Sequence, residues 1–176
     1  MTLPENQKPN APLVLTLEME KSAQDWAQSM RERHFPKERN IVPAHVTLFH
    51  ALPSDTADII CAYFTRPRPT PSIRIDAPFL LGRGVAYRIA SPEMQQIRAE
   101  LAALIPAERR TPQDRKSWHP HLTIQNKVSP QQARELLKDL SREYKACQTY
   151  AVALRLWRYL DGPWELLSRL PFTITK

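Results

Sequence analysis

Two short segments of the chain share the pattern His-apolar-Thr-apolar, one beginning at His45 and the other at His121. Successive side chains of a strand point to opposite faces, so each segment is predicted to place its histidine and its threonine, Thr47 or Thr123, on one face. Residues two apart lie about 7 Å apart along a strand, which lets an imidazole and a hydroxyl reach one tetrahedral oxyanion. Two such strands facing each other would hold a phosphate from both sides.

A pair of histidines beside one phosphorus atom suits in-line displacement. One neutral imidazole can take a proton from the nucleophile while the other, as imidazolium, gives a proton to the departing oxygen. The threonine hydroxyls would donate hydrogen bonds to the non-bridging oxygens, where charge gathers in the transition state. A metal site built from His45, His50, His119 and His121 is the weaker interpretation, because no carboxylate or cysteine stands at ligand spacing.

These residues resemble the two-histidine (2H) phosphoesterase superfamily, and within it the branch of 2′-5′ RNA ligases and cyclic phosphodiesterases. The signature of that group is a pair of His-x-Thr/Ser-x motifs, which this chain carries as His45-Val46-Thr47-Leu48 and, after Pro120, as His121-Leu122-Thr123-Ile124. The resemblance implies that His45 and His121 are catalytic, that Thr47 and Thr123 bind phosphate, and that no cofactor or metal is needed.

The resemblance also implies the reaction. A 2′,3′-cyclic phosphate at the end of an RNA or a nucleotide would be opened by water to a 2′-phosphate or, in a reversible ligation, by a 5′-hydroxyl to give a 2′-5′ linkage. The sequence does not choose between hydrolysis and ligation, and it does not say which histidine is the base.

The elements that would position the motifs follow the same order twice. Each half is predicted to contain a strand, a serine-capped helix, a motif strand, a second such helix and a final strand, and the chain ends in a hairpin. The predicted strands outside the motifs cover 13–19, 72–81, 85–90, 149–160 and 164–173, and the helix-opening serines are Ser22, Ser54, Ser91 and Ser129. The resemblance implies an α+β fold of two pseudo-symmetric lobes, with antiparallel sheets lining a central cleft and helices packed outside. Residues 1–12 are expected to form a disordered tail, and residues 13–176 a single bilobal domain.

Composition agrees with an anionic ligand. The 176 residues include 25 Lys and Arg against 18 Asp and Glu, a formal charge of +7. No apolar stretch approaches the roughly 18 residues that span a bilayer, and the polar start of the chain lacks the features of a secretory signal. We therefore expect a cytoplasmic monomer that makes no membrane contact and takes RNA or a nucleotide with a cyclic phosphate as substrate.

Five further residues are expected to contact the substrate. Phe49 and Gln125 share the alternation of the motif histidines, and Arg155, Trp157 and Tyr159 share one face of their strand. An aromatic ring offers a base a stacking surface, and arginine suits phosphate.

The source of positive charge beside the phosphate is open. Several relatives carry a basic residue shortly after the second motif, where this chain has Gln125 and Asn126, so Arg155 is one candidate. His50 alternates with the apolar motif residues, and we interpret it as a hydrogen-bonded histidine at the edge of the core. The basic segment 106–117 is expected to be a loop, either contacting substrate or simply solvated.

Two other functions fit the same residues. A non-catalytic RNA-binding module would use the basic cleft without turnover, and its affinity for RNA would fall steeply with salt. A phosphodiesterase for a nucleotide-like metabolite other than RNA would use the same chemistry on the same fold.

Overall fold

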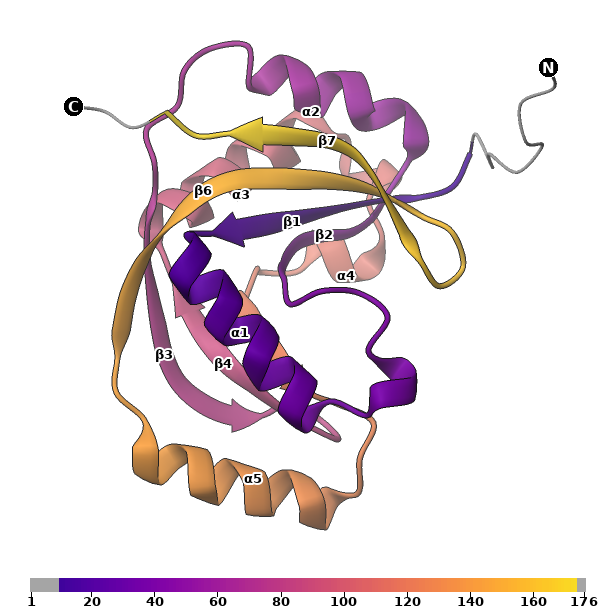
Figure 1. Cartoon of the computed structure of the whole chain (residues 1–176). Coiled ribbons are helices and arrows are strands. Elements are labelled where there is room, and N and C mark those ends of the chain that lie inside the picture. The colour runs from indigo at the N-terminus through magenta and orange to yellow at the C-terminus, as the bar shows by residue number, and fades with distance from the viewer. Residues whose placement is uncertain (1–9, 174–176) are drawn as a thin grey trace, which may run out of the picture.

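The computed structural model describes residues 10–173, which form one antiparallel sheet with helices outside it (Figure 1). The strands are β1 (Leu13–Met19), β2 (Val46–Leu52), β3 (Ser72–Leu80), β4 (Val85–Ala90), β5 (His121–Gln125), β6 (Cys147–Tyr159) and β7 (Trp164–Pro171). The α-helices are α1 (Lys21–His34), α2 (Ala57–Tyr63), α3 (Pro92–Leu104), α4 (Pro112–Arg115) and α5 (Pro130–Glu143), and short 3₁₀ turns are η1 (Lys37–Arg39), η2 (Ser54–Thr56) and η3 (Ala107–Arg109).

The sheet closes on itself. Its strands follow the order β1-β2-β5-β4-β3-β6-β7, and β1 also pairs with β6, so six strands form a ring and β7 lies along the outer edge of β6. Around the ring the order is symmetric about the β2–β5 seam, since β1 corresponds to β4, β2 to β5 and β3 to β6. The repeated order of elements is therefore present as a pseudo-two-fold arrangement of strands.

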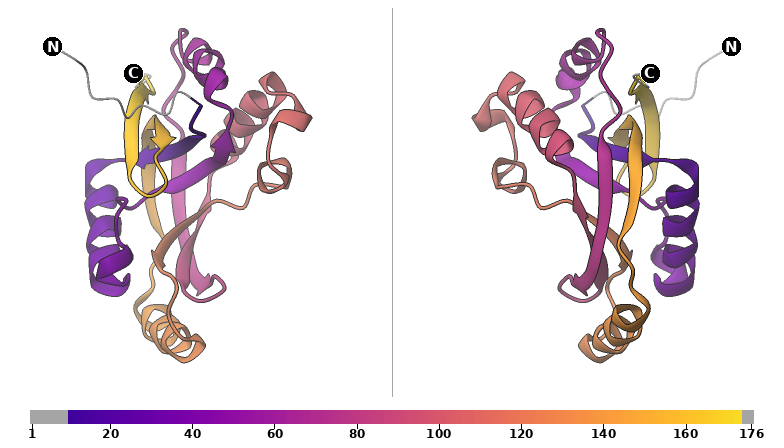
Figure 2. Two further views of the ribbon diagram at one scale, coloured as in Figure 1. Left: turned by 90° about the vertical axis from the view of Figure 1, so that its right-hand side faces the viewer. Right: turned by 90° about the vertical axis from the view of Figure 1, so that its left-hand side faces the viewer.

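The α+β class, the antiparallel pairing and the outer position of the helices are confirmed. In Figure 2 the purple α1 and the pink α3 lie on opposite flanks of the strands, and the orange α5 lies below them. The two expected sheets are continuous with each other, because β2 meets β5 at one seam and β3 meets β6 at the other. The last strand of the first half, β3, therefore pairs with β4 of the second half, and the last ring strand of the second half, β6, pairs with β1 of the first half.

The apolar alternation seen in the sequence forms the core. Side chains such as Leu15, Leu48, Leu122 and Leu154 are fully buried in the sheet, and buried helix residues such as Met94 pack against them. Burying this apolar surface drives the halves together and fixes which face of each motif strand is left polar.

Two of the four predicted serine caps are present. The Ser91 hydroxyl accepts a hydrogen bond from the Met94 N–H, and Ser129 forms a complete capping box with Gln132. Ser22 is not a cap, because the Glu20 N–H already bonds to the strand β6 at the Tyr150 carbonyl and the helix begins at Lys21. Ser54 opens the 3₁₀ turn η2 rather than an α-helix.

Segment 106–117 is not a simple loop. It contains η3 and the short helix α4, whose N-terminus is capped by the Thr111 hydroxyl. Residues 1–9 of the expected tail lie outside the described residues, but Ala11 is buried and the Pro12 carbonyl accepts a hydrogen bond from Tyr159, so order begins before Leu13. Within 10–173, no helix combines the length and the apolar character that crossing a bilayer requires.

Candidate active site

The two His-x-Thr segments meet at the seam between β2 and β5. Val46 pairs with Leu122 across this antiparallel seam, and both are fully buried. His45 therefore stands opposite Thr123, and Thr47 opposite His121, on the other face of the sheet, which we call the motif face. Facing residues of such a pair have Cβ atoms about 5 Å apart and diagonal residues about 7 to 8 Å apart, so all four side chains surround one small area.

Both imidazoles are anchored in the same way. The Nδ1 atom of His45 lies 2.6 Å from the Pro43 carbonyl, and the Nδ1 atom of His121 lies 2.9 Å from the His119 carbonyl. A carbonyl only accepts hydrogen bonds, so each Nδ1 carries a proton and donates it. Each Nε2 is left to exchange a proton with whatever occupies the motif face.

His45 is biased toward its neutral form. Burial lowers the pKa of His45 to about 4, and the nearby charges of Arg31, His50 and His121 act in the same direction, against the hydrogen bond to Pro43. The ring also lies against Trp164, with ring centroids 4.8 Å apart. A neutral imidazole with a free Nε2 is suited to accept a proton.

Two of the predicted substrate contacts do not lie on the motif face. Phe49 is 0% exposed and Gln125 is 7% exposed, so both belong to the buried side of their strands. The cause is a β-bulge in each strand. Thr47 and Phe49, which are two residues apart, pair with two adjacent residues of β1, and Thr123 and Gln125 likewise pair with two adjacent residues of β4. Each bulge adds one residue directly after the threonine and reverses the alternation beyond it.

The remaining three predicted contacts lie around strand β6. Arg155 donates a hydrogen bond of 2.7 Å to Glu18 and lines a small cavity with His45 and Trp157. Trp157 is 8% exposed and its indole N–H donates to the Thr16 hydroxyl, so it supports this wall rather than offering an open stacking face.

Tyr159, at the end of β6, is 38% exposed, and Trp164 follows it across the hairpin. Among the described contacts it is Trp164, not Tyr159, that touches a motif histidine.

Sequence reasoning missed Arg88. In β4 it pairs with His121, and its guanidinium carbon lies 4.3 Å from the ring centre of Phe79, which in turn stands edge-on to His121 at 6.3 Å. The side chain of Arg88 is exposed and forms no hydrogen bond or ion pair with any described residue. The alternation of 85–90 would have placed Arg88 on a polar face, but only the strand order shows that this face is next to the second motif.

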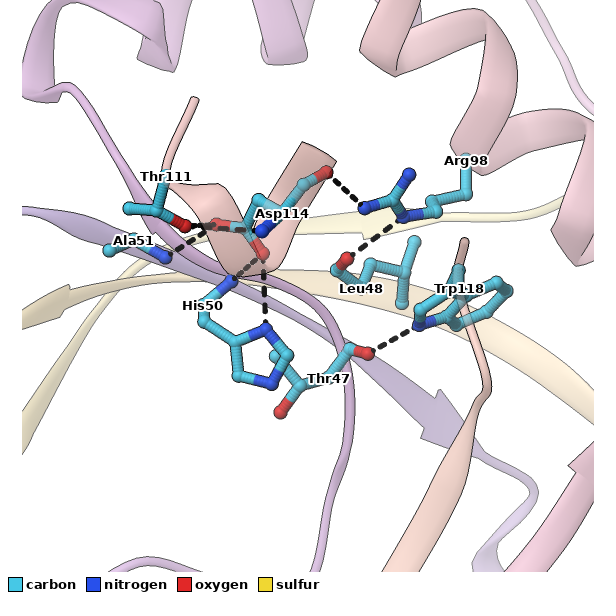
Figure 3. A network of polar contacts seen from close by, with 8 residues as sticks. All are labelled: Thr47, Leu48, His50, Ala51, Arg98, Thr111, Asp114 and Trp118. Carbon is cyan, nitrogen blue, oxygen red and sulfur yellow. Dashed lines mark hydrogen bonds and ion pairs between the residues drawn. The ribbon is translucent and has the colours of Figure 1, made fainter. Parts of the chain in front are cut away.

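Buried side chains from the helices hold the motif strands by their backbones. Arg31 of α1 donates from Nη1 to the Thr123 carbonyl at 3.1 Å, and Arg98 of α3 donates from Nε to the Leu48 carbonyl at 3.2 Å. The indole of Trp118 donates to the Thr47 carbonyl at 2.8 Å (Figure 3). Each motif strand is thus tied to a helix or loop from the other half of the chain.

Over the part of the chain that the structure describes, no three His, Cys, Asp or Glu side chains gather in a way that could hold a metal ion. His45, His50 and His121 are each hydrogen-bonded through Nδ1 to an oxygen acceptor of the protein. The chemistry open to the site's own residues is proton transfer by imidazole together with hydrogen bonding from hydroxyl and guanidinium groups.

A closed antiparallel sheet that brings two His-x-Thr-x strands together at one seam is the architecture of the two-histidine phosphoesterases. The chain belongs to the 2′-5′ RNA ligase superfamily, whose family model matches residues 19–163. No curated protein matches this chain.

Solved structures share the fold at low sequence identity. TT0787 of Thermus thermophilus is 14% identical with a TM-score of 0.65, and the match covers 94% of this chain and 100% of that one. LigT of E. coli complexed with 3′-AMP is 16% identical with a TM-score of 0.59, covering 93% and 99%. LigT has also been solved with NADP+, a match of TM-score 0.53 at 14% identity that covers 93% and 98%.

Proposed function

We propose that this protein is a metal-independent phosphoesterase that opens 2′,3′-cyclic phosphate ends of RNA or nucleotides with water, and that a 5′-hydroxyl can replace water in a reversible 2′-5′ ligation. The observation that carries the proposal is the pair of Nδ1-anchored imidazoles at the β2–β5 seam, each beside a threonine of the other strand. Membership of the 2′-5′ RNA ligase superfamily and the nucleotides bound by the structurally similar LigT support it.

The geometry suggests an order of proton transfers. His45, whose pKa burial lowers, removes the proton from the attacking water through Nε2 as the oxygen bonds to phosphorus. His121 donates a proton from Nε2 to the departing 3′-oxygen as the bond between that oxygen and phosphorus breaks, leaving a 2′-phosphomonoester. In the ligation direction a 5′-hydroxyl takes the place of water.

The charge of the transition state requires donors around phosphorus. Thr47 and Thr123 stand between the imidazoles and can donate to the two non-bridging oxygens. Arg88 is the better candidate for the nearby cation, because Arg155 is already bonded to Glu18 whereas Arg88 has no acidic partner among the described residues. A guanidinium beside His121 would also favour binding of the anionic substrate.

Incubation of the purified protein with a nucleoside 2′,3′-cyclic phosphate in the presence of EDTA tests this function. We expect release of the 2′-phosphomonoester at an undiminished rate with EDTA, identified by chromatography against the 2′ and 3′ isomers. Failure to convert both cyclic nucleotides and oligonucleotides with cyclic ends would refute the proposal, and turnover that EDTA abolishes would refute its metal independence.

A further inference from the structure

His50 lies on the motif face, contrary to the expectation from strict alternation. Thr47 pairs with Thr16 and Phe49 with Leu15, so the bulge at Leu48 places Phe49 in the core and returns His50 to the side of Thr47. The side chain of His50 is 38% exposed. Figure 3 shows its ring beside Thr47, with one nitrogen bonded to Asp114 and the other on the side away from that carboxylate.

A buried carboxylate fixes this ring. Asp114 of α4 is 1% exposed, and its Oδ1 accepts hydrogen bonds from the backbone N–H of His50 at 2.9 Å and from the Nδ1 of the same residue at 3.1 Å. Its Oδ2 accepts from the Ala51 N–H at 3.0 Å and from the Thr111 hydroxyl at 3.2 Å. Burial alone would raise the pKa of Asp114, but the hydrogen bonds from His50 and Ala51 outweigh it and hold that pKa below its ordinary range.

The consequence is a third imidazole prepared in the same manner as the two motif histidines. An ionised carboxylate only accepts hydrogen bonds, so Nδ1 of His50 carries a proton and Nε2 is its available atom. His50 is close enough to His45 to lower the pKa of that residue electrostatically, as His121 also does. At the matching place after the second motif stands Asn126, which cannot carry a charge.

The carboxylate does not need the imidazole to hold the strand. Two of the four hydrogen bonds to Asp114 come from backbone N–H groups of the bulged part of β2, and a third comes from Thr111. A residue without a ring at position 50 would keep all three. The imidazole is therefore available for another role.

We propose that His50, as an imidazolium, donates a hydrogen bond from Nε2 to the phosphate of the substrate on the Thr47 side of the site, and that Asp114 is the positioning residue that orients it. This inference rests on the proposed function, because it places the ligand on the motif face. It gives the phosphate a contact from an imidazole that takes no part in the two proton transfers.

Steady-state kinetics with a nucleoside 2′,3′-cyclic phosphate test the role. For His50→Ala we expect KM to rise about tenfold, the weight of one charge-assisted hydrogen bond, with kcat changed less than about twofold. His50→Gln, which keeps an amide donor, should recover part of the loss, and His34→Gln in α1 is the matched control, with KM unchanged. An unchanged KM in His50→Ala, or an equal rise in the control, would overturn the proposal.

Titration with inorganic phosphate, followed through the imidazole ¹⁵N signals by NMR, separates this inference from the proposed function. We expect the Nε2 signal of His50 to move with the same saturation curve as that of His121. Loss of the movement in Thr47→Val would agree with a shared phosphate. A protein that turns over no cyclic phosphate would refute the proposed function, whereas the titration would still report on His50. A His50 signal that stays in place, whether or not phosphate binds elsewhere, overturns the role of this residue.

Discussion

At the scale of single residues, the site consists of side chains whose free atoms all point to one face. His45 and His121 each donate a hydrogen bond from Nδ1 to the carbonyl two residues earlier in the chain, so Nε2 of each ring is available to a ligand. Thr47 and Thr123 complete the group from the opposite strand. Roles can therefore be assigned atom by atom, and each assignment has a measurable consequence.

Removing either motif imidazole should slow catalysis strongly and leave the fold intact. His45→Ala and His121→Ala are each expected to lower kcat by about 10² to 10⁴, because one general acid or base is lost. Neither histidine belongs to the apolar core, so the melting temperature at neutral pH should change little. Single-turnover kinetics on a cyclic nucleotide and calorimetry measure the two effects, and a variant that keeps its activity removes that histidine from the mechanism.

The pH dependence tests whether His45 is the base. A base must be unprotonated, and burial lowers the pKa of His45 from 6.5 to about 4. The acidic limb of kcat/KM, which reports the free enzyme, should then fall near pH 4. An acidic limb near pH 6.5 would contradict the assignment of the base to His45.

The same burial predicts a loss of stability in acid. Because the pKa of His45 is lower in the folded protein than in the unfolded chain, the unfolded chain binds the proton more readily. The contribution of His45 to the free energy of unfolding is therefore complete above pH 6.5 and is lost as the pH falls toward 4. Urea unfolding of the wild type and of His45→Ala across this range should show a shallower decline in the variant.

At the scale of elements, each motif strand is held by a helix from the other half of the chain, β5 by α1 and β2 by α3. Arg98 of α3 is 8% exposed and bonds to the carbonyls of Leu48 in β2 and Asp114 in α4. Its guanidinium also lies 4.5 Å from the ring centre of Phe49. One side chain thus joins the first motif strand to the helix that holds His50.

Arg98→Met should be costly because it leaves two carbonyls without a donor. We expect the free energy of unfolding to fall by about 2 to 4 kcal/mol, the range for orphaned buried polar groups. Arg134→Met on the exposed side of α5 is the matched control and should stay within about 0.5 kcal/mol. Urea denaturation measures both, and equal stability of the two variants would show that the bridging contacts of Arg98 contribute nothing.

The elements also show where sequence reasoning succeeds and where it ends. Strict alternation correctly separates His45 and Thr47 from Val46, because those residues precede the bulge in β2. It fails for Phe49, His50 and Gln125, because the inserted residue follows the threonine and has no mark in the sequence. The helix α4 is short enough to be taken for a loop, and the pairing of its Asp114 with His50 joins residues 64 positions apart.

At the scale of the whole molecule, the halves are interlocked rather than merely adjacent. β3 is the last strand of the first half but pairs with β4 of the second half, and β6 is the last ring strand of the second half but pairs with β1 of the first half. Neither half can bury its core alone, since its outer strand is supplied by the other. The pseudo-symmetric order was predictable from the repeated elements, whereas this exchange depends on strand pairings that local sequence does not encode.

Interlocked halves should unfold together. We expect a single transition in urea, with coincident curves from far-UV circular dichroism and from tryptophan fluorescence. Trp26 in α1 and Trp164 in β7 report on separate parts of the fold, so the comparison is informative. Two resolved transitions would show that the halves are independent domains.

The narrow seam between β2 and β5 has a consequence for how the spacing of His45 and His121 is maintained. One residue pair, Val46 with Leu122, joins these strands, whereas β3 and β6 on the far wall are joined over four pairs from Ser72 to Ile75. The distance between the Nε2 atoms of His45 and His121 therefore depends on the pairing of β3 with β6 as well as on the seam itself. A change in that distant wall that shifts its register would misalign the proposed proton donor and acceptor without touching either of them.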